Sequence, residues 1–324
     1  MFKILYSAGN RVGAGEILRR FLLSKPNCII KTAAYIKSSY NIQFIDWTLD
    51  ALIDESMVTG NNLDKKDLIK LFDHDYLPNL IAKQAALLIE EVSAYAPDLI
   101  ICDGEPILAH IAKSLNIELW YVSPLHLLNG IKWNFPGCHY FYYLENQRVA
   151  MDTWPKADKT FIYSPFAWFG LKLKKGFQWI CPDVIANNDP FIDATFISTD
   201  HERIKDITNI VNCFNSNIKL NYINSKWLFT SGETSVISDG INSGVGRIAV
   251  APRIDDPELL INAFLINKLR LGDDLSQIEF MDKFSINEIE NSFLKPRMQY
   301  NLFPKEKTLK EEIENYVRRS NNKA

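Results

Sequence analysis

The sequence predicts an α/β protein of two domains, each built on a parallel β-sheet. Short apolar runs of strand length alternate with helical segments along most of the chain, which is the pattern of strand–helix–strand units. A length of 324 residues suits two domains of ordinary size. A stretch with several Pro and Gly residues, Ser164 to Asp183, separates two such alternations and is expected to link them.

The first alternation predicts a domain of residues 1–168. Its apolar run from Leu99 to Cys102 follows Pro97-Asp98 and is typical of a buried parallel strand. Pro106 suits the first turn of the helix that follows. We expect strands at 2–7, 28–35, 44–47, 99–102, 118–122 and 159–163, the last of this sheet, and helices at 14–24, 64–71, 77–94 and 106–115.

The second alternation predicts a domain of residues 169–300, and residues 301–324 form a terminal segment with a charged helix at 306–319. Expected strands lie at 194–198, 218–222, 226–229 and 247–251, with a helix at 202–214. Two further helices are expected, one after the polar loop at Ser231 and one after the acidic loop that ends near Glu258.

Composition excludes several classes of protein. A hydrophobic content of 47% and an aromatic content of 12% argue against disorder, and a net charge of −3 gives no global attraction to nucleic acid. The 5 cysteines show no metal-ligand spacing and suit reduced thiols. No apolar run approaches the ~20 residues of a transmembrane helix, and the N-terminus does not read as a signal peptide. We therefore expect a cytoplasmic protein without integral membrane contact.

The stretch from Ser231 to Asn262 carries the clearest chemical pattern. Small residues in its first loop let backbone N–H groups approach an anion, and the following helix adds its positive amino end. The residues expected to hold the anion are Ser231, Gly232, Thr234 and Ser235. Carboxylates follow at Asp239 and, after the next strand, at Asp255, Asp256 and Glu258, where open α/β sheets bind ligands. An anion site followed by hydroxyl-binding carboxylates suits a nucleotide-sugar.

The N-terminal half supplies further candidates after its predicted strands. Glu16 follows a glycine-rich turn, Asp103 and Glu105 follow the strand at 99–102, and His126 follows the strand at 118–122. Glu16 as a general base needs its pKa raised by burial, and neighbouring carboxylates would also raise it. The alternatives are that Glu16 merely favours the start of its helix and that Asp103 caps the next one.

This order of parts resembles the GT-B glycosyltransferases. The donor half of that group has the pattern G-G-x-S-x-x-x-E-A, then G-x-P, a strand and D/E-Q before Asn-Ala. Ser231–Ser235, Asp239, Asp256-Pro257-Glu258 and Asn262-Ala263 stand at these positions. The acceptor half is similar to G-x-G-H-x-x-R and P-D-L-V-I-S-D-x-E-P, with Gly13, Gly15 and Arg19 matching, Glu16 in place of the His, and Pro97 to Pro106 matching the second pattern.

The resemblance implies two Rossmann-like domains with parallel sheets facing a central cleft and a C-terminal helix crossing back to the first domain. It implies a hexosyl- or pentosyltransferase with no cofactor, whose donor is expected to be a UDP-linked nucleotide-sugar. The implied catalytic residues are Glu16 and Asp103. The implied acceptor contacts are Gly13, Glu105 and His126. The implied donor residues are Ser231, Gly232, Thr234, Ser235, Asp239, Asp256 and Glu258. No D-x-D motif stands at a predicted strand end, so transfer is expected to need no metal.

Several alternatives stay open from sequence. The segment before Ser231 is shorter than in the resembled enzymes, which bears on how a nucleotide base is bound. The acceptor is a glycan, a lipid-linked molecule or a hydroxymethylated base in DNA. A DNA acceptor would suit the aromatic stretch from Trp133 to Tyr143 and the basic run Lys172 to Lys175. A nucleotide-sugar epimerase, or a non-catalytic nucleotide or nucleic-acid binding protein, would have the same architecture.

Overall fold

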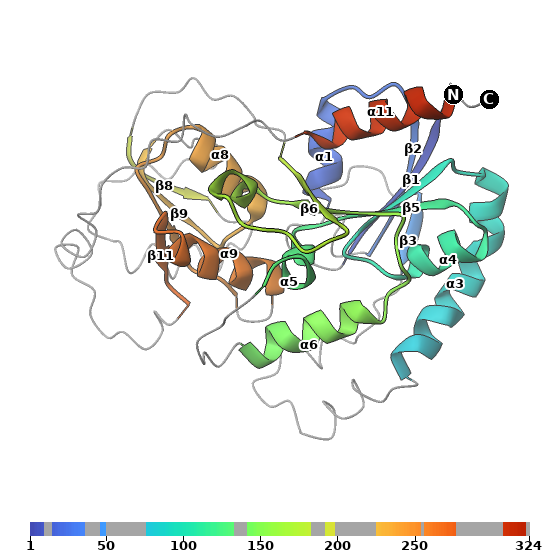
Figure 1. Cartoon of the computed structure of the whole chain (residues 1–324), viewed down its shortest axis with the longest axis horizontal. Coiled ribbons are helices and arrows are strands. Elements are labelled where there is room, and N and C mark those ends of the chain that lie inside the picture. Colours follow the sequence, from blue (N-terminus) through green and yellow to red (C-terminus); the bar gives the residue numbers. More distant parts are fainter. Residues whose placement is uncertain are drawn as a thin grey trace.

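The computed structural model describes residues 1–9, 15–35, 46–49, 76–132, 141–182, 192–197, 225–253, 256–276 and 307–321. These residues form two parallel sheets with helices packed on them (Figure 1). The predicted α/β fold class is confirmed. The strand expected at 218–222 and the helices expected at 64–71 and 202–214 lie outside the described residues, as do Gly13 and Asp255.

The first sheet has 7 parallel strands in the order β3-β2-β1-β4-β5-β6-β7. Its strands are β1 (Lys3–Ala8), β2 (Ile29–Tyr35), β3 (Trp47–Leu49), β4 (Leu99–Asp103), β5 (Glu118–Val122), β6 (Lys159–Tyr163) and β7 (Phe177–Ile180). The central pair aligns Ile4 with Leu99 and Ala8 with Asp103. Because all strands run the same way, their carboxyl ends meet at one edge, which faces the second sheet (Figure 1).

Alternation along β1 divides the core of this half into two layers. Ile4, Tyr6 and Ala8 face one layer, which α1 (Glu16–Leu23) and α11 (Leu309–Asn321) cover. Leu5 faces the other layer, which α3 (Tyr76–Tyr95) and α4 (Ile107–Ser114) cover. β4 is buried along its whole length, as expected for a strand covered on both faces.

The second sheet has 4 parallel strands in the order β11-β10-β9-β8. Its strands are β8 (Ile192–Ile197), β9 (Ser225–Thr230), β10 (Arg247–Val250) and β11 (Gly272–Asp274), and its helices are α8 (Thr234–Asn242) and α9 (Pro257–Lys268). Gly272 lies so close to β10 that an added Cβ would come within 1.6 Å of the Ile248 carbonyl oxygen. The pairing of β10 with β11 therefore requires glycine there.

The first sheet extends past the expected domain boundary at residue 168. β7 pairs with β6 through Phe161↔Gln178 and Tyr163↔Ile180, so β6 is not the last strand. Gly170 and Gly176, which in sequence are typical of a linker, have positive φ and lie in turns of the β6–β7 connection. A further helix, α6 (Phe141–Asp152), begins within the aromatic stretch from Trp133 to Tyr143.

The C-terminal helix α11 lies on the first domain beside α1 (Figure 1). Leu309 and Ile313 are buried in the same core layer as Ile4 and Tyr6. Tyr316 packs edge-on against Trp120 with the ring centroids 5.3 Å apart. These contacts explain why a helix whose charged residues would otherwise favour solvent remains docked.

Apolar packing also joins the two halves. The largest contact cluster contains Leu125, Ile131 and Phe166 from the first half together with Ile237 and Leu260 from α8 and α9. Two short 3-10 helices bring the first-half residues there, η3 (Pro124–His126) and η4 (Pro165–Phe169). Each begins with a Ser-Pro pair whose serine hydroxyl accepts the N–H two residues later. The interface is thus partly an apolar core rather than an open cleft.

Candidate functional site

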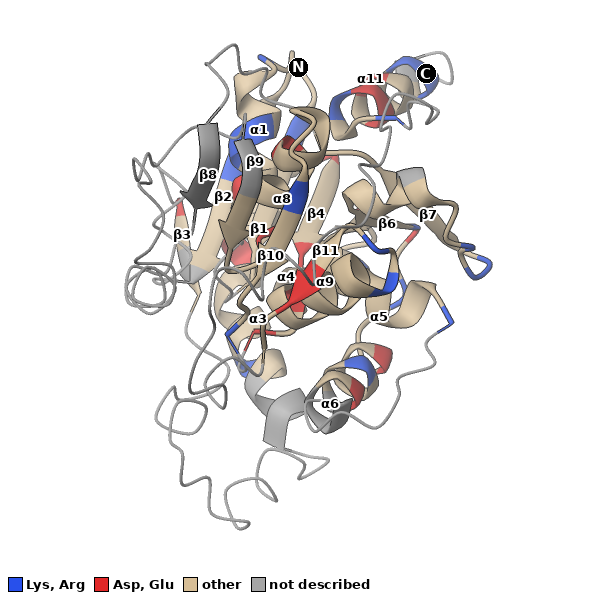
Figure 2. Ribbon diagram, turned by 90° about the vertical axis from the view of Figure 1, so that its left-hand side faces the viewer, with Lys and Arg blue, Asp and Glu red and all other residues tan. Residues whose placement is uncertain are grey.

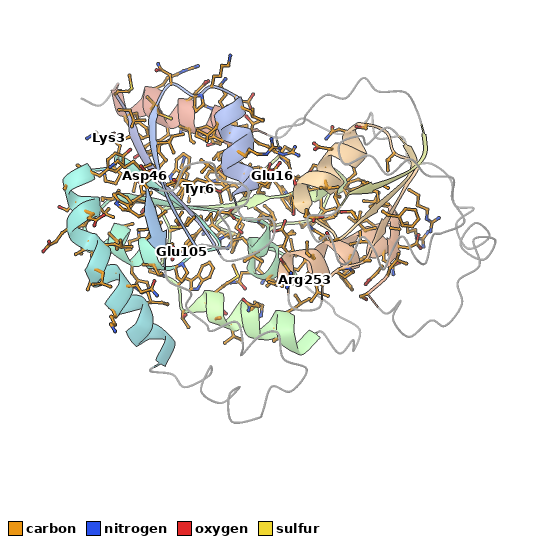
Figure 3. All side chains as sticks on the ribbon, turned by 180° about the vertical axis from the view of Figure 1, so that it is seen from behind. Lys3, Tyr6, Glu16, Asp46, Glu105 and Arg253 are labelled. Carbon is orange, nitrogen blue, oxygen red and sulfur yellow. The ribbon has the colours of Figure 1, made fainter. Side chains whose placement is uncertain are left out.

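A pocket lies where the carboxyl edge of the first sheet meets the amino end of α8. Its lining residues come from both halves of the chain: Glu16, Ile17, Pro124, Tyr163, Thr234, Ser235 and Glu258. The space measures about 180 Å³, open solvent at its mouth included. Figure 3 shows Glu16 at the end of α1 that faces the second sheet.

The loop between β9 and α8 has a conformation that requires glycine. Gly232 has φ +111°, and an added Cβ would lie 2.8 Å from Val250 Cγ1. The buried carboxylate of Glu233 accepts hydrogen bonds from the hydroxyls of Thr230 (2.9 Å) and Ser231 (2.5 Å). The Glu233 carboxylate therefore closes this loop on itself, and the neighbouring Thr234 and Ser235 line the pocket.

The start of α9 is bonded to the start of α8. Asp256 is the N-cap of α9, where its carboxylate accepts the Glu258 N–H at 2.9 Å. The Glu258 carboxylate accepts the backbone N–H of Thr234, the first residue of α8, at 3.1 Å. Asn262 donates to the Gly232 carbonyl (2.7 Å) and to the Thr234 hydroxyl (2.9 Å).

A charge network connects α1 to α8 across the interface. The Arg20 guanidinium binds both carboxylate oxygens of Asp239, at 2.7 and 2.5 Å, and donates to Glu16 at 2.8 Å. Glu16 also accepts two bonds from Arg19, at 2.6 and 2.7 Å. Figure 2 shows the basic segments of α1 beside α8. The network holds the two halves together and neutralises charge at the pocket.

This network sets the protonation of Glu16. Burial pushes the pKa of Glu16 upward, but hydrogen bonds and charge from Arg19 and Arg20 outweigh it, so the pKa lies below its usual 4.5. The rise in pKa that a strong general base requires is therefore not found. Glu16 is an ionised carboxylate at neutral pH.

Solved structures with the same arrangement are glycosyltransferases. SsfS6 from Streptomyces sp. SF2575, complexed with thymidine diphosphate, has a TM-score of 0.58 at 11% identity, over 98% of this chain and 100% of that one. Spinosyn forosaminyltransferase SpnP has a TM-score of 0.57 at 12% identity, over 98% and 99%. SnogD from Streptomyces nogalater has 0.52 at 9% identity, over 98% and 99%. This chain has the GT-B glycosyltransferase fold. No family model and no curated protein matches its sequence.

The second half of this GT-B fold brings only part of the predicted donor set to the pocket. Thr234, Ser235 and Glu258 line it. Ser231 and Gly232 are buried beneath it, where Ser231 binds Glu233. Two predicted donor carboxylates have structural partners: Asp239, expected at a ribose, binds Arg20, and Asp256, expected at the sugar, caps α9. Their donor contacts stay predictions.

Among the described residues predicted from the first half, Glu16 lines the pocket, whereas Asp103, Glu105 and His126 do not. Asp103 is fully buried and accepts the Tyr6 hydroxyl at 2.9 Å. Glu105, expected to contact the acceptor, instead accepts the backbone N–H groups of Ile107 and Leu108 at the start of α4; Figure 3 shows it well away from Glu16. The helix cap expected of Asp103 is thus made by Glu105.

His126 is packed rather than presented to a ligand. Its ring lies against Tyr121 at 5.1 Å and Trp154 at 6.1 Å between centroids, and the residue is 4% exposed. The neighbouring Pro124 reaches the pocket instead. The acceptor contact expected of His126 stays a prediction.

Sequence reasoning missed Arg20 and Tyr163. Arg20 lies four residues after Glu16, the spacing at which side chains on a helix meet, and this signal was available. Tyr163 ends β6 at the ligand edge of the sheet. Within the described residues, no group of three or more His, Cys, Asp or Glu side chains could hold a metal ion. No helix in the described part of the chain meets the length and hydropathy of a membrane span.

Proposed function

We propose that this protein is a glycosyltransferase that takes a sugar from a nucleoside diphosphate donor and attaches it to an acceptor hydroxyl. One observation carries the proposal: the Glu16 carboxylate of the first half and the amino end of α8 in the second half line the same pocket. Glu16, assigned to the acceptor, thereby lies across the pocket from the helix end that is assigned to the donor anion. Group transfer requires its two reactants to be held together in this way.

The donor diphosphate is assigned to the amino end of α8. Thr234 and Ser235 lie at this helix end and line the pocket, and the helix dipole favours negative charge there. Neighbours of the same fold bind such groups: SsfS6 was solved with thymidine diphosphate and LpCGTa with UDP. We assign a UDP- or TDP-linked sugar as the donor. The helix end, not a metal ion, is assigned to stabilise the leaving diphosphate.

Glu16 is assigned to the acceptor hydroxyl. In the reaction the acceptor oxygen attacks the anomeric carbon, the bond from that carbon to the diphosphate breaks, and the acceptor proton passes to Glu16. Because the pKa of Glu16 is lowered by Arg19 and Arg20, its main contribution is to orient the hydroxyl through a charge-assisted hydrogen bond, with proton transfer late in the step. Asp103 has no part in this assignment, since it binds Tyr6.

The experiment that tests this proposal is a thermal-shift panel of UDP, TDP, GDP and their sugar conjugates on the purified chain. A ligand that binds only the folded state stabilises it by about 2.7 kcal/mol at a hundredfold excess over its Kd. A selective shift with one conjugate supports the proposal and identifies the donor. The absence of any shift in a folded sample contradicts it and favours a non-catalytic protein on this fold; DNA binding is then the next measurement.

A further inference from the structure

The Glu258 carboxylate lies where the proposed donor would place a phosphate. It accepts the Thr234 N–H at 3.1 Å, lines the pocket and is 2% exposed. The first N–H groups of a helix have no intrahelical partner, and here the partner is a carboxylate supplied by α9. One N–H does not make full hydrogen bonds to two anions, and the anions would also repel each other.

The surrounding loop is held independently of Glu258. Asn262 donates from one amide nitrogen to the Gly232 carbonyl and the Thr234 hydroxyl. The orientation of this amide is determined, because a carbonyl oxygen only accepts. Since the Thr234 oxygen already accepts this bond, its own proton is available to a ligand oxygen. The loop and its donors therefore keep their geometry when the Glu258 side chain moves.

The start of α9 is likewise held independently of the Glu258 side chain. Asp256 caps the helix by accepting the backbone N–H groups of Glu258 and Leu259, and Pro257 begins it. A rotation of the Glu258 side chain away from α8 thus breaks no backbone bond of α9. The pocket space is about 180 Å³ with open solvent included, and such a movement also makes room for a diphosphate.

We propose that Glu258 competes with the donor diphosphate for the amino end of α8 and thereby sets donor affinity. This inference rests on the proposed function. It replaces the expectation that Glu258 contacts the sugar: the carboxylate has to leave α8 before the diphosphate binds there. Removing its charge then strengthens donor binding, whereas removing a sugar-binding residue would weaken it.

The test is the Kd of UDP and TDP, measured by calorimetry on the full chain and on Glu258→Gln and Glu258→Ala. We expect binding about tenfold tighter in both variants, equivalent to the loss of one competing charge-assisted hydrogen bond. The control is Glu233→Gln, which removes the same charge from the carboxylate that precedes Thr234. Glu233 is also 2% exposed and binds Thr230 and Ser231. Its Kd should stay within about twofold of the unmodified value.

The outcomes are separable. Equal or weaker binding by both Glu258 variants, with binding by the unmodified chain retained, overturns the inference and leaves the proposed function standing. Binding by none of the proteins, with melting temperatures showing that all are folded, overturns both. An equal gain in Glu233→Gln means a general charge effect and also overturns the inference. A crystal structure of the UDP complex gives a second readout: a phosphate oxygen on the Thr234 N–H with Glu258 rotated away supports it, and Glu258 still on that N–H refutes it.

Discussion

Arg20 and Asp239 join the two halves of the molecule through a two-pronged ion pair, with nitrogen–oxygen distances of 2.7 and 2.5 Å. Their side chains are only 3% and 10% exposed. Burial alone would lower the pKa of Arg20, but Asp239 and Glu16 raise it above its usual value. The guanidinium is therefore permanently charged, and its two carboxylate partners make that charge tolerable inside the interface.

Loss of either partner of this pair should destabilise the protein strongly. We expect Arg20→Ala to lower the free energy of unfolding by about 3–5 kcal/mol, because it leaves a buried carboxylate uncompensated. Arg19, whose side chain is 42% exposed, is the matched control, and Arg19→Ala should cost under about 1 kcal/mol. Urea denaturation measures both. Equal costs for the two variants would refute the importance of burial here.

Acid should weaken the interface through Glu16. Its pKa is lower in the folded protein than the usual 4.5, so its stabilising contribution is present above pH 4.5 and is lost as the pH falls through the folded-state pKa. We expect the free energy of unfolding to fall more steeply below pH 4.5 in the unmodified chain than in Glu16→Gln. Parallel pH profiles would show that the folded environment does not favour the Glu16 carboxylate.

Transfer should slow when Glu16 loses its charge. Glu16→Gln is expected to lower kcat by about 100-fold, the lower end for acid–base groups, because the carboxylate is a weak base, and to leave the Kd of the donor unchanged. Glu145→Gln is the matched control, since Glu145 also pairs with an arginine three residues later, Arg148, but does not line the pocket. Full activity of Glu16→Gln would remove Glu16 from the reaction.

Two glycines with positive φ allow the cost of backbone strain to be measured apart from the cost of a steric collision. Gly232 has φ +111° and no room for a Cβ, whereas Gly244 has φ +71° with nothing within 4 Å of the added atom. Gly244→Ala should cost about 1–2 kcal/mol, the penalty of a left-handed alanine. Gly232→Ala should cost more and weaken nucleotide binding. Thermal unfolding and UDP titration of both variants check this; equal effects would contradict the collision with Val250.

The C-terminal helix should stabilise the first domain through its apolar side. Ile313, which is 3% exposed, belongs to the core layer of β1. We expect Ile313→Ala to cost about 2–5 kcal/mol of unfolding free energy. Ser320→Ala, which removes only a bond to the Tyr316 carbonyl, should cost under about 1.5 kcal/mol. If Ile313→Ala proves equally mild, α11 is not part of the core.

Much of the strand and helix order was predictable because local pattern controls it. The apolar run at Leu99 forms β4, the helical period after residue 76 forms α3, and Asp256-Pro257 begins α9 as cap and first-turn proline. β7 was missed because the connection from β6 contains Gly170 and Gly176, which are typical of a linker. The domain boundary expected at residue 168 stays a prediction, although β7 extends the first sheet beyond it.

The site residues were less predictable, because a carboxylate's role depends on which partner reaches it. By itself, the sequence determined a two-domain α/β fold, with a glycine-requiring loop before α8 and an acid at the start of α1. Only the tertiary structure decided that Asp239 meets Arg20 across 219 positions of chain and that Glu258 reaches the Thr234 N–H. Local spacing determines which helices and strands form. Their charged side chains meet partners from other elements only when those elements pack.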